Sequence, residues 1–206
     1  MNTIDAFILI GGKSSRMGEP KHLIEIHGTT MLDLILDQVR FALPESRVRL
    51  VTSAGIDTVT SGGEYVKDVF ADRGAWSGVH AALVNSKSEW TFVIACDFPL
   101  ISSSLIRNLA HFVNEHADTV IPRQPDGRPQ PLCAFYRTTV CRKLADSILS
   151  SGETPALLSM SDSVRTKFVA FEECGTHKNE FLNVNSWQEV EKAVSLLDAN
   201  GRVVAE

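Results

Sequence analysis

The sequence lacks several features that mark common classes of protein. No apolar run approaches the ~20 residues that a membrane-spanning helix needs, and no cationic segment followed by a long apolar one opens the chain, so we expect no signal peptide. The four cysteines are scattered without C-x-x-C spacing, which disfavours a zinc site or a disulfide framework. Lys and Arg number 20 against 25 Asp and Glu, for a net charge of −5, so no global field would draw the chain to nucleic acid or to an anionic membrane. We therefore expect a cytoplasmic protein without nucleic-acid or membrane partners.

Several catalytic and phosphate-binding motifs are also absent. The six histidines show no metal-ligand spacing such as H-E-x-x-H, and Ser14 and Ser15 lack the G-x-S-x-G context of a hydrolase nucleophile. A Walker A loop needs four residues between its first Gly and Gly-Lys-Ser/Thr. A dinucleotide fingerprint needs G-x-G-x-x-G, whereas Gly11 and Gly12 are adjacent. The sequence thus carries neither of the two commonest phosphate loops.

What is present is a different glycine-containing loop near the N-terminus. Four apolar residues, 7–10, predict a buried strand of a parallel sheet. Gly11 and Gly12 then allow a sharp turn with exposed backbone N–H groups. Backbone donors in a tight turn bind anions, and the cations beside them suit a triphosphate: Lys13, Arg16 and Lys21. The alternative is an ordinary strand-to-helix turn with solvated cations.

Strand and helix patterns alternate along most of the chain. Strands are expected near residues 7–10, 47–52, 65–70, 90–95, 118–122, 131–137 and 164–171, and helices near 30–41, 79–83, 105–112, 139–149, 156–160 and 187–197. This alternation predicts a three-layer α/β/α fold with a mostly parallel sheet in a single domain, residues 1–206. Ligands of such folds bind at the carboxyl ends of the strands. Three polar loops fall there: residues 11–21, 97–99 and 183–185.

Asp97 follows the apolar strand 90–95 in the run Cys96-Asp97-Phe98-Pro99. A carboxylate at the end of a buried strand is unfavourable unless it is paired or binds a metal. Magnesium takes one or two carboxylates and keeps water and phosphate oxygens as its other ligands, which suits an aspartate facing a nucleotide. The alternative is a turn or helix-capping aspartate before Pro99.

Two further stretches are candidates for nucleotide binding. Asn183 and Asn185 lie just before the last predicted helix, where asparagine is also a common cap, and Ser186 and Glu189 have capping-box spacing. Asp72 precedes a small-residue turn, residues 74–78, whose glycines would let backbone approach a base or sugar. A plain turn explains that stretch almost as well.

These stretches together resemble the nucleotidyltransferases of the molybdenum cofactor guanylyltransferase type. The signature loop of that family is Leu-Ala-Gly-Gly-x-Ser-x-Arg-Met-Gly with a later Lys, and residues 9–18 and Lys21 match it, Ile10 replacing the usual Ala. Cys96-Asp97-x-Pro99 and Asn183-x-Asn185 match two more blocks. Residues 74–78 match Gly-Pro-Leu-Ala-Gly only at the end glycines. The resemblance covers nearly the whole chain in order.

The resemblance implies a Rossmann-like nucleotidyltransferase. GMP would pass from GTP to the terminal phosphate of molybdopterin, or of its molybdenum-loaded form, and pyrophosphate would leave. Mg²⁺ is the implied cofactor with Asp97 as its ligand, and transient contact with molybdoenzymes or cofactor-handling proteins is expected. The implied catalytic residues are Lys21, Asp97 and Arg16. The implied nucleotide-binding residues are Leu9, Gly11, Gly12, Lys13, Ser14, Lys21, Asp72, Asn183 and Asn185.

Three alternatives stay open at this point. A related cytidylyltransferase, acting on molybdopterin or on a sugar-alcohol phosphate, would share most motifs, although molybdopterin cytidylyltransferases tend to carry Asp-x-Asp where this chain has Asn183 and Asn185. A nicotinamide oxidoreductase is disfavoured because residues 49–54 end the second strand without an acidic residue for a ribose. A non-catalytic binder is disfavoured because Lys21 and Asp97 are both intact.

Overall fold

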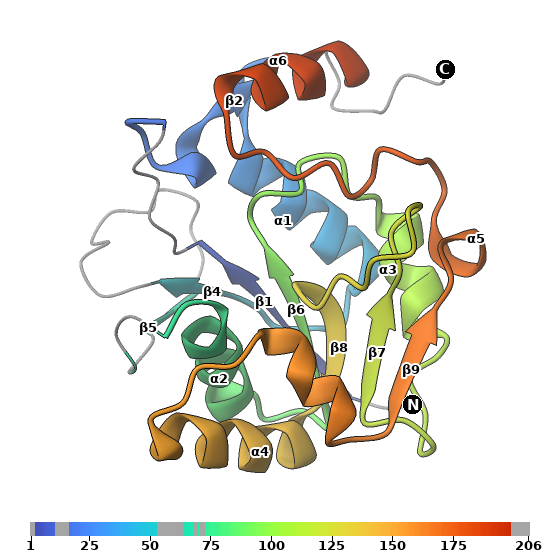
Figure 1. Cartoon of the computed structure of the whole chain (residues 1–206). Helices are drawn as coiled ribbons and strands as arrows, with labels where there is room; N and C mark the ends of the chain where they lie inside the picture. Colours follow the sequence, from blue (N-terminus) through green and yellow to red (C-terminus); the bar gives the residue numbers. More distant parts are fainter. Residues whose placement is uncertain (1–2, 11–16, 53–63, 68–69, 71–72, 199–206) are drawn as a thin grey trace.

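The computed structural model describes residues 3–10, 17–52, 64–67, 70 and 73–198. Its centre is a seven-stranded sheet in the order β5-β4-β1-β6-β8-β7-β9 (Figure 1). Strand β8 is antiparallel to both neighbours, and the other pairs are parallel. The mostly parallel sheet predicted from the sequence is confirmed. The strands are β1 (Ile4–Leu9), β4 (Val48–Thr52), β5 (Glu64–Lys67), β6 (Trp90–Ala95), β7 (Thr119–Pro122), β8 (Cys133–Arg137) and β9 (Thr166–Val169).

The two central strands, β1 and β6, determine where the predicted loops lie. They pair in parallel from Ile4 opposite Trp90 to Leu9 opposite Ala95. The N–H of Cys96 then donates to the carbonyl of Leu9 at 3.0 Å, one step beyond the strand ends. Both strands therefore end at the same level of the sheet.

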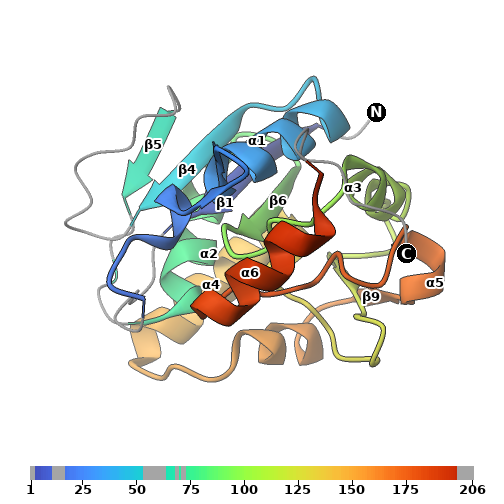
Figure 2. The ribbon, with the colours of Figure 1, turned by 90° about the horizontal axis from the view of Figure 1, so that it is seen from above.

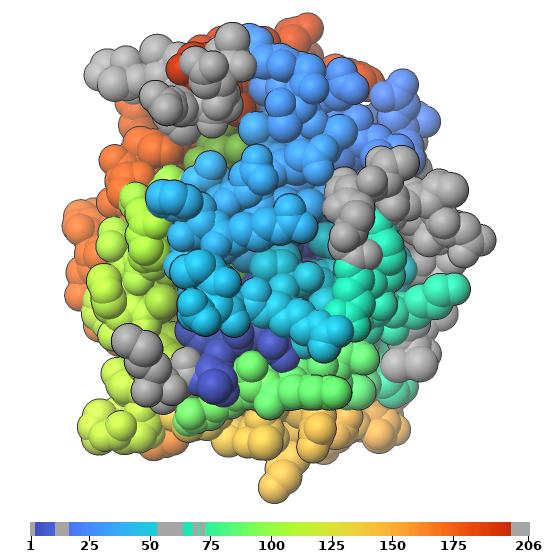
Figure 3. All heavy atoms as spheres, turned by 180° about the vertical axis from the view of Figure 1, so that it is seen from behind, coloured from blue at the N-terminus to red at the C-terminus, as the bar shows by residue number. Residues whose placement is uncertain are grey.

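Helices cover both faces of the sheet, as the three-layer prediction requires. Helices α1 (Met31–Ala42), α3 (Ser103–Ala110) and α5 (Phe171–Cys174) pack on one face, and Figure 3 shows α1 and α3 side by side on that side of the molecule. Helices α2 (Ala75–Asn85) and α4 (Thr138–Ser151), with the 3₁₀ helix η2 (Leu157–Asp162), pack on the other. No described helix is long and apolar enough to cross a bilayer.

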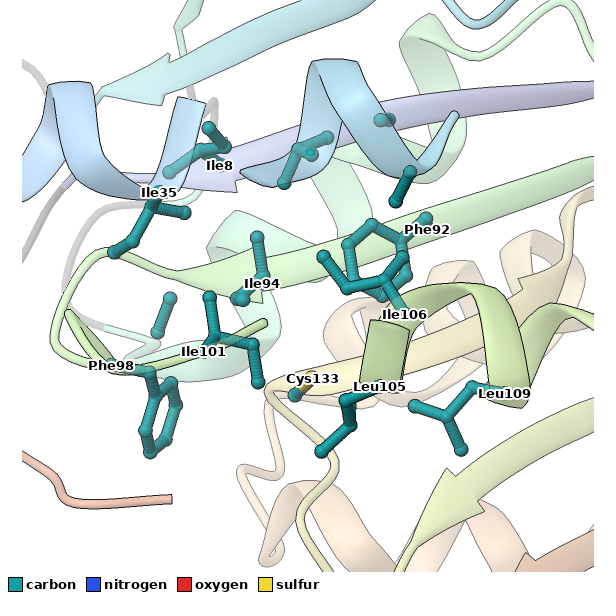
Figure 4. Packing of buried hydrophobic residues seen from close by; sticks show 14 of the residues in the cluster. Ile8, Ile35, Phe92, Ile94, Phe98, Ile101, Leu105, Ile106, Leu109 and Cys133 are labelled. Carbon is teal, nitrogen blue, oxygen red and sulfur yellow. The ribbon is translucent and has the colours of Figure 1, made fainter. Parts of the chain in front are cut away.

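The core between the sheet and α1 and α3 consists of interdigitated aliphatic and aromatic side chains (Figure 4). Ile35 of α1 and Ile106 of α3 belong with Ile8, Phe92 and Ile94 of the sheet to one cluster, and all five are fully buried. Each such side chain contributes about 1.5–3 kcal/mol relative to leaving it exposed. This burial fixes the strand ends that carry the polar loops.

A third and smaller hydrophobic cluster lies beyond the carboxyl ends of the strands. It joins the segment after the first loop, with η1 (Lys21–Leu23), β2 (Glu25–Ile26) and β3 (Thr29–Thr30), to the last helix, α6 (Trp187–Leu196). Helix α6 lies above the ends of β1 and β6 (Figures 1 and 2). We call this the cap cluster; its buried members are Met17, Ile24, Ile26, Met31, Leu100, Val184, Val190, Ala193 and Leu197.

Two predictions about local structure were wrong. The turn expected over residues 74–78 ends at Gly74, whose φ of 57° only glycine adopts easily, and α2 begins at Ala75. Gly78 lies inside that helix, where a Cβ would be 3.0 Å from Leu9 Cδ1, so the glycine allows α2 to pack closely on β1. The strand expected to reach residue 171 ends at Val169. There Glu173 accepts a 3.0 Å hydrogen bond from the N–H of Ala170, which favours the short helix α5.

Candidate functional site

Asp97 lies two residues beyond the carboxyl end of β6 and is half-buried. Its carbonyl accepts a hydrogen bond from the N–H of Val184 at 2.9 Å. This bond brings residues 183–185, from near the end of the chain, alongside the segment after β6. Two of the three loops that the sequence placed at this edge therefore meet there. Asp97 caps no helix, because Ser102 is the N-cap of α3.

Two hydrogen bonds link Lys21 to the two asparagines, which lie beside Asp97. Lys21 Nζ donates to Asn185 Oδ1 at 2.5 Å, and Asn185 Nδ2 donates to Asn183 Oδ1 at 2.6 Å. The Asn183 side chain in turn lies close enough to Asp97 to lower the pKa of its carboxyl group. Four residues predicted for the site, distant in the sequence, are thus gathered at the ends of β1 and β6.

The electrostatics of Asp97 leave it only partly compensated. Burial raises the pKa of its carboxyl group, while the positive charge of Lys21, a backbone N–H and the Asn183 side chain lower it. Asp97 Oδ1 is buried and finds no hydrogen-bond partner among the residues that the structure describes. A buried acceptor without a donor is unfavourable, so this oxygen is suited to receive a cation.

The donor set at Asp97 fits magnesium better than a metal held entirely by protein. In the described ranges, no group of three or more His, Cys, Asp or Glu residues could hold an ion. Mg²⁺ needs only one or two carboxylates, because water and substrate phosphates supply its remaining ligands. The neighbouring Cys96 is not suited to act as a nucleophile, since burial, followed by the charge of Asp97, raises its pKa to about 12.

The start of α6 fixes the position of the asparagines. Ser186 is the N-cap, and its side chain accepts from the N–H of Glu189. Glu189 Oε2 accepts a hydrogen bond from the N–H of Asn185 at 2.7 Å. Asn185, Ser186 and Lys21 all lower the pKa of Glu189, the N–H of Asn185 most strongly. Because Ser186 fills the capping role, the side chains of Asn183 and Asn185 are left to interact with Lys21 and Asp97.

Several predicted residues cannot be placed in this geometry. Gly11, Gly12, Lys13, Ser14, Arg16 and Asp72 lie outside the described residues. Leu9 is the last residue of β1, and its buried side chain belongs to the core against α2. Its carbonyl is bonded to Cys96, so it adjoins the site through backbone alone. Nucleotide binding by these seven residues stays a prediction.

Glu189 is the residue at this site that the sequence analysis did not include. Its spacing from Ser186 was interpreted only as a helix cap. The missed signal was that Glu189, placed by its capping interaction with Ser186, would also bind the backbone of Asn185.

Residues 6–164 match the family described as the MobA-like NTP transferase domain. The chain belongs to this family. The resemblance inferred from the motifs is therefore confirmed, and with it the nucleotidyltransferase class. The Rossmann-like α/β class is also confirmed by the observed sheet and its covering helices.

Relatives of this NTP transferase align over nearly its full length. A protein of Desulfosudis oleivorans named molybdenum cofactor guanylyltransferase is 27% identical, covering 98% of this chain and 100% of its own. A protein of the same name from Aliivibrio salmonicida is 30% identical over 92% of this chain and 95% of its own. The crystal structure of molybdopterin-guanine dinucleotide biosynthesis protein A from Archaeoglobus fulgidus superposes with a TM-score of 0.77, at 18% identity, covering 93% and 97% of the two chains. At that identity the structural likeness shows the fold alone.

Proposed function

We propose that this NTP transferase transfers GMP from GTP to the terminal phosphate of molybdopterin, or of its molybdenum-loaded form, and releases pyrophosphate. The observation that carries the proposal is the hydrogen-bonded chain from Lys21 through Asn185 to Asn183, which lies beside Asp97 at the ends of β1 and β6. Its support is the name shared by relatives that align with 92–98% of this chain. The product is the guanine dinucleotide form of the cofactor.

The proposed reaction is a single displacement at the α-phosphorus of GTP. An oxygen of the acceptor phosphate forms the new P–O bond, and the bond from the α-phosphorus to the bridging oxygen of the β-phosphate breaks. The electron pair leaves with pyrophosphate, and no covalent enzyme intermediate forms. Positioning and charge neutralisation are sufficient for this class of chemistry.

Lys21 supplies positive charge at this edge of the sheet. Its ammonium is held by Asn185, which bonds Asn183, and it lowers the pKa of Asp97. We assign it to the α-phosphate, where charge changes as the transition state forms. The Gly11-Gly12 turn with Lys13, Ser14 and Arg16 is assigned to the β- and γ-phosphates, and Leu9 and Asp72 to the nucleoside side of the site.

Asp97 is the residue that would hold Mg²⁺, through the oxygen that lacks a donor. Magnesium bound there supplies positive charge against the phosphate oxygens of the substrate. We further propose that residues 1–206 act as one nucleotidyltransferase domain in the cytoplasm. Contact with molybdoenzymes or with other proteins that handle the cofactor would be transient.

The choice of GTP over CTP rests on Asn183 and Asn185. Neutral amides at these positions add hydrogen bonds to the site without adding negative charge beside Asp97. Two carboxylates there would change both the charge and the pattern of donors. A molybdopterin cytidylyltransferase is the alternative that this difference disfavours.

The test is a panel of nucleotides measured by thermal shift with Mg²⁺, followed by turnover. A ligand present at one hundred times its dissociation constant stabilises the folded state by about 2.7 kcal/mol. We expect GTP to raise the melting temperature more than CTP, ATP or UTP, and GTP with molybdopterin to yield pyrophosphate and the guanine dinucleotide by mass spectrometry. Equal or greater stabilisation and turnover with CTP would establish the cytidylyltransferase instead. No pyrophosphate with any nucleotide would overturn the proposal.

A further inference from the structure

The capping box at the start of α6 differs from the usual arrangement in one bond. In the usual box, the Glu at N3 accepts from the backbone N–H of the N-cap residue itself. Here Glu189 Oε2 accepts from the N–H of Asn185, one residue before the N-cap, at 2.7 Å. Ser186 Oγ donates to the same oxygen at 3.0 Å. The carboxylate therefore fixes the backbone of the residue whose side chain binds Lys21.

Asn185 is exposed, so its contacts need such an anchor. Its Oδ1 accepts from Lys21 and its Nδ2 donates to Asn183, both in reach of competing water. A lysine side chain loses considerable rotamer entropy when it is held in one position. An acceptor that moved with a fraying helix end would hold Lys21 poorly, whereas one fixed by Glu189 on its backbone side holds a single geometry.

From these contacts we infer that Glu189 is a positioning residue for nucleotidyl transfer, because it fixes Asn185 and thereby the location of Lys21 Nζ. The inference rests on the proposed function, which assigns Lys21 to the α-phosphate. Glu189 acts through Asn185 and is not itself a catalytic residue. It also adds a negative charge that faces Lys21. Both effects keep the ammonium at the start of α6.

Steady-state kinetics of three variants test this role, with the nucleotide varied at saturating acceptor. Glu189→Ala should lower kcat at least about tenfold and change KM less than about threefold, because a misplaced Lys21 fails mainly in the transition state. Glu189→Gln retains an oxygen that can accept from Asn185 and should restore kcat to within about threefold of wild type. Ser186→Ala is the matched control, since it removes the cap of the same helix and the bond from Ser186 Oγ to Glu189 but retains both groups of the bond between Glu189 and Asn185. It should lower the melting temperature while kcat stays within about twofold.

A double variant then separates positioning from helix stability. In an Asn185→Ala background, Glu189→Ala should lower kcat no further, because the path to Lys21 is already broken. Additive losses in the double variant, or equal kcat in Glu189→Ala and Ser186→Ala, would overturn the inference and leave Glu189 as a helix cap.

The measurements use whichever nucleotide the wild-type protein turns over, so that failure of the proposed function is recognised separately. Turnover of CTP rather than GTP by the wild type would reject the guanylyltransferase while the comparison of variants still decides the role of Glu189. The NMR signals of the Lys21 side chain give a readout without turnover. They should move toward those of a free lysine in Glu189→Ala and Asn185→Ala, and stay in place in Ser186→Ala. Unchanged signals in Glu189→Ala would contradict the inference.

Discussion

Lys21 and Asn185 are joined by a hydrogen bond of 2.5 Å across 164 positions of sequence. Lys21 ends the first loop and Asn185 precedes the last helix, so the bond joins two segments of the cap cluster near the ends of β1 and β6. Neither partner is placed by its own neighbours in sequence alone. The site depends on the docking of α6 as well as on the sheet. Substitutions can therefore affect the site through either one.

Two lysines of the first loop should affect different kinetic constants. Lys21→Ala should mainly lower kcat, because the proposal places its charge where the transition state develops. Lys13→Ala should mainly raise KM for GTP, because the β- and γ-phosphates are bound in both ground and transition states. Each change is expected to cost about 2–4 kcal/mol, as for the loss of one preorganised donor. Steady-state kinetics with GTP varied at saturating acceptor measure both. If both variants changed KM alone, Lys21 would be only a binding residue.

Asp97→Asn should abolish most turnover and yet raise the stability of the ligand-free protein. Burial is the largest influence on the Asp97 carboxyl and raises its pKa. The folded state therefore holds this proton more tightly than the unfolded state does, and ionisation of Asp97 at neutral pH lowers the free energy of unfolding. Asparagine does not ionise, so the free energy of unfolding of the variant is not lowered in this way.

The pH dependence of the free energy of unfolding tests this explanation. The stabilisation of Asp97→Asn over wild type should be present at pH 7 and shrink as the pH falls through the folded pKa toward the ordinary value of about 3.9, below which both states are protonated. Urea unfolding without Mg²⁺ at several pH values measures this. A variant that was less stable than wild type at pH 7 would show that the contacts of Asp97 with Lys21 and Asn183 outweigh its burial.

The pKa of Asp118, at the amino end of β7, is shifted in the opposite direction to that of Asp97. It is buried just before β7 and accepts hydrogen bonds of 2.8 Å from both Nε and Nη2 of Arg165. Arg165 is the main cause of a lowered pKa, so the stabilisation is present above the unfolded value and is lost as the pH falls through the folded one. Asp118→Asn should lower the free energy of unfolding by about 1.5–3 kcal/mol at pH 7, toward the lower end because Arg165 is largely exposed.

That difference should disappear in acid while kcat stays unchanged, since Asp118 precedes the amino end of β7, at the edge opposite Asp97. Glu64→Gln is the matched control, because it breaks the exposed 2.6 Å pair with Arg47 and should change stability by less than about 1 kcal/mol. A fall in kcat in Asp118→Asn would indicate that this edge communicates with the site.

Gly74 should resist substitution for reasons of backbone conformation alone. Its φ and ψ are 57° and −136°, and a Cβ at this position would meet no neighbouring atom within 4 Å among the described residues. Gly74→Asn should therefore lower the free energy of unfolding by about 1–3 kcal/mol through strain. Gly152→Asn is the control, because φ 82° and ψ −6° fall in the left-handed region that asparagine tolerates. Equal losses in the two variants, measured by urea unfolding, would contradict this explanation.

The fold was largely predictable because its strongest signals are local. Residues 90–95 form β6 as the apolar run indicated, and Ser186 begins α6 as its capping-box spacing predicted. Two features depended on tertiary contacts. Gly78 was assigned to a turn because glycine favours turns, but close packing on Leu9 places it within α2. The reversal of β8 between β6 and β7 follows from pairing partners that periodicity does not identify.

Most residues of the site could be predicted from the sequence, whereas the hydrogen bonds between them could not. The rule that loops gather at the carboxyl ends of parallel strands correctly brought Asp97 together with Asn183 and Asn185. It did not reveal that Asn185 would bind Lys21, because that contact depends on how α6 docks on the cap cluster. The role inferred for Glu189 was hidden for the same reason, since a capping signal describes only its own helix.

The late position of α6 in the sequence has a consequence for synthesis on the ribosome. All seven strands of the sheet, through β9, are translated before Asn183, Asn185 and α6 emerge. Every strand of the sheet is thus available to a nascent chain well before Lys21 has its partner. A chain released before residue 183 would contain all seven strands but lack Asn183, Asn185 and α6, and we expect it to lack transfer activity.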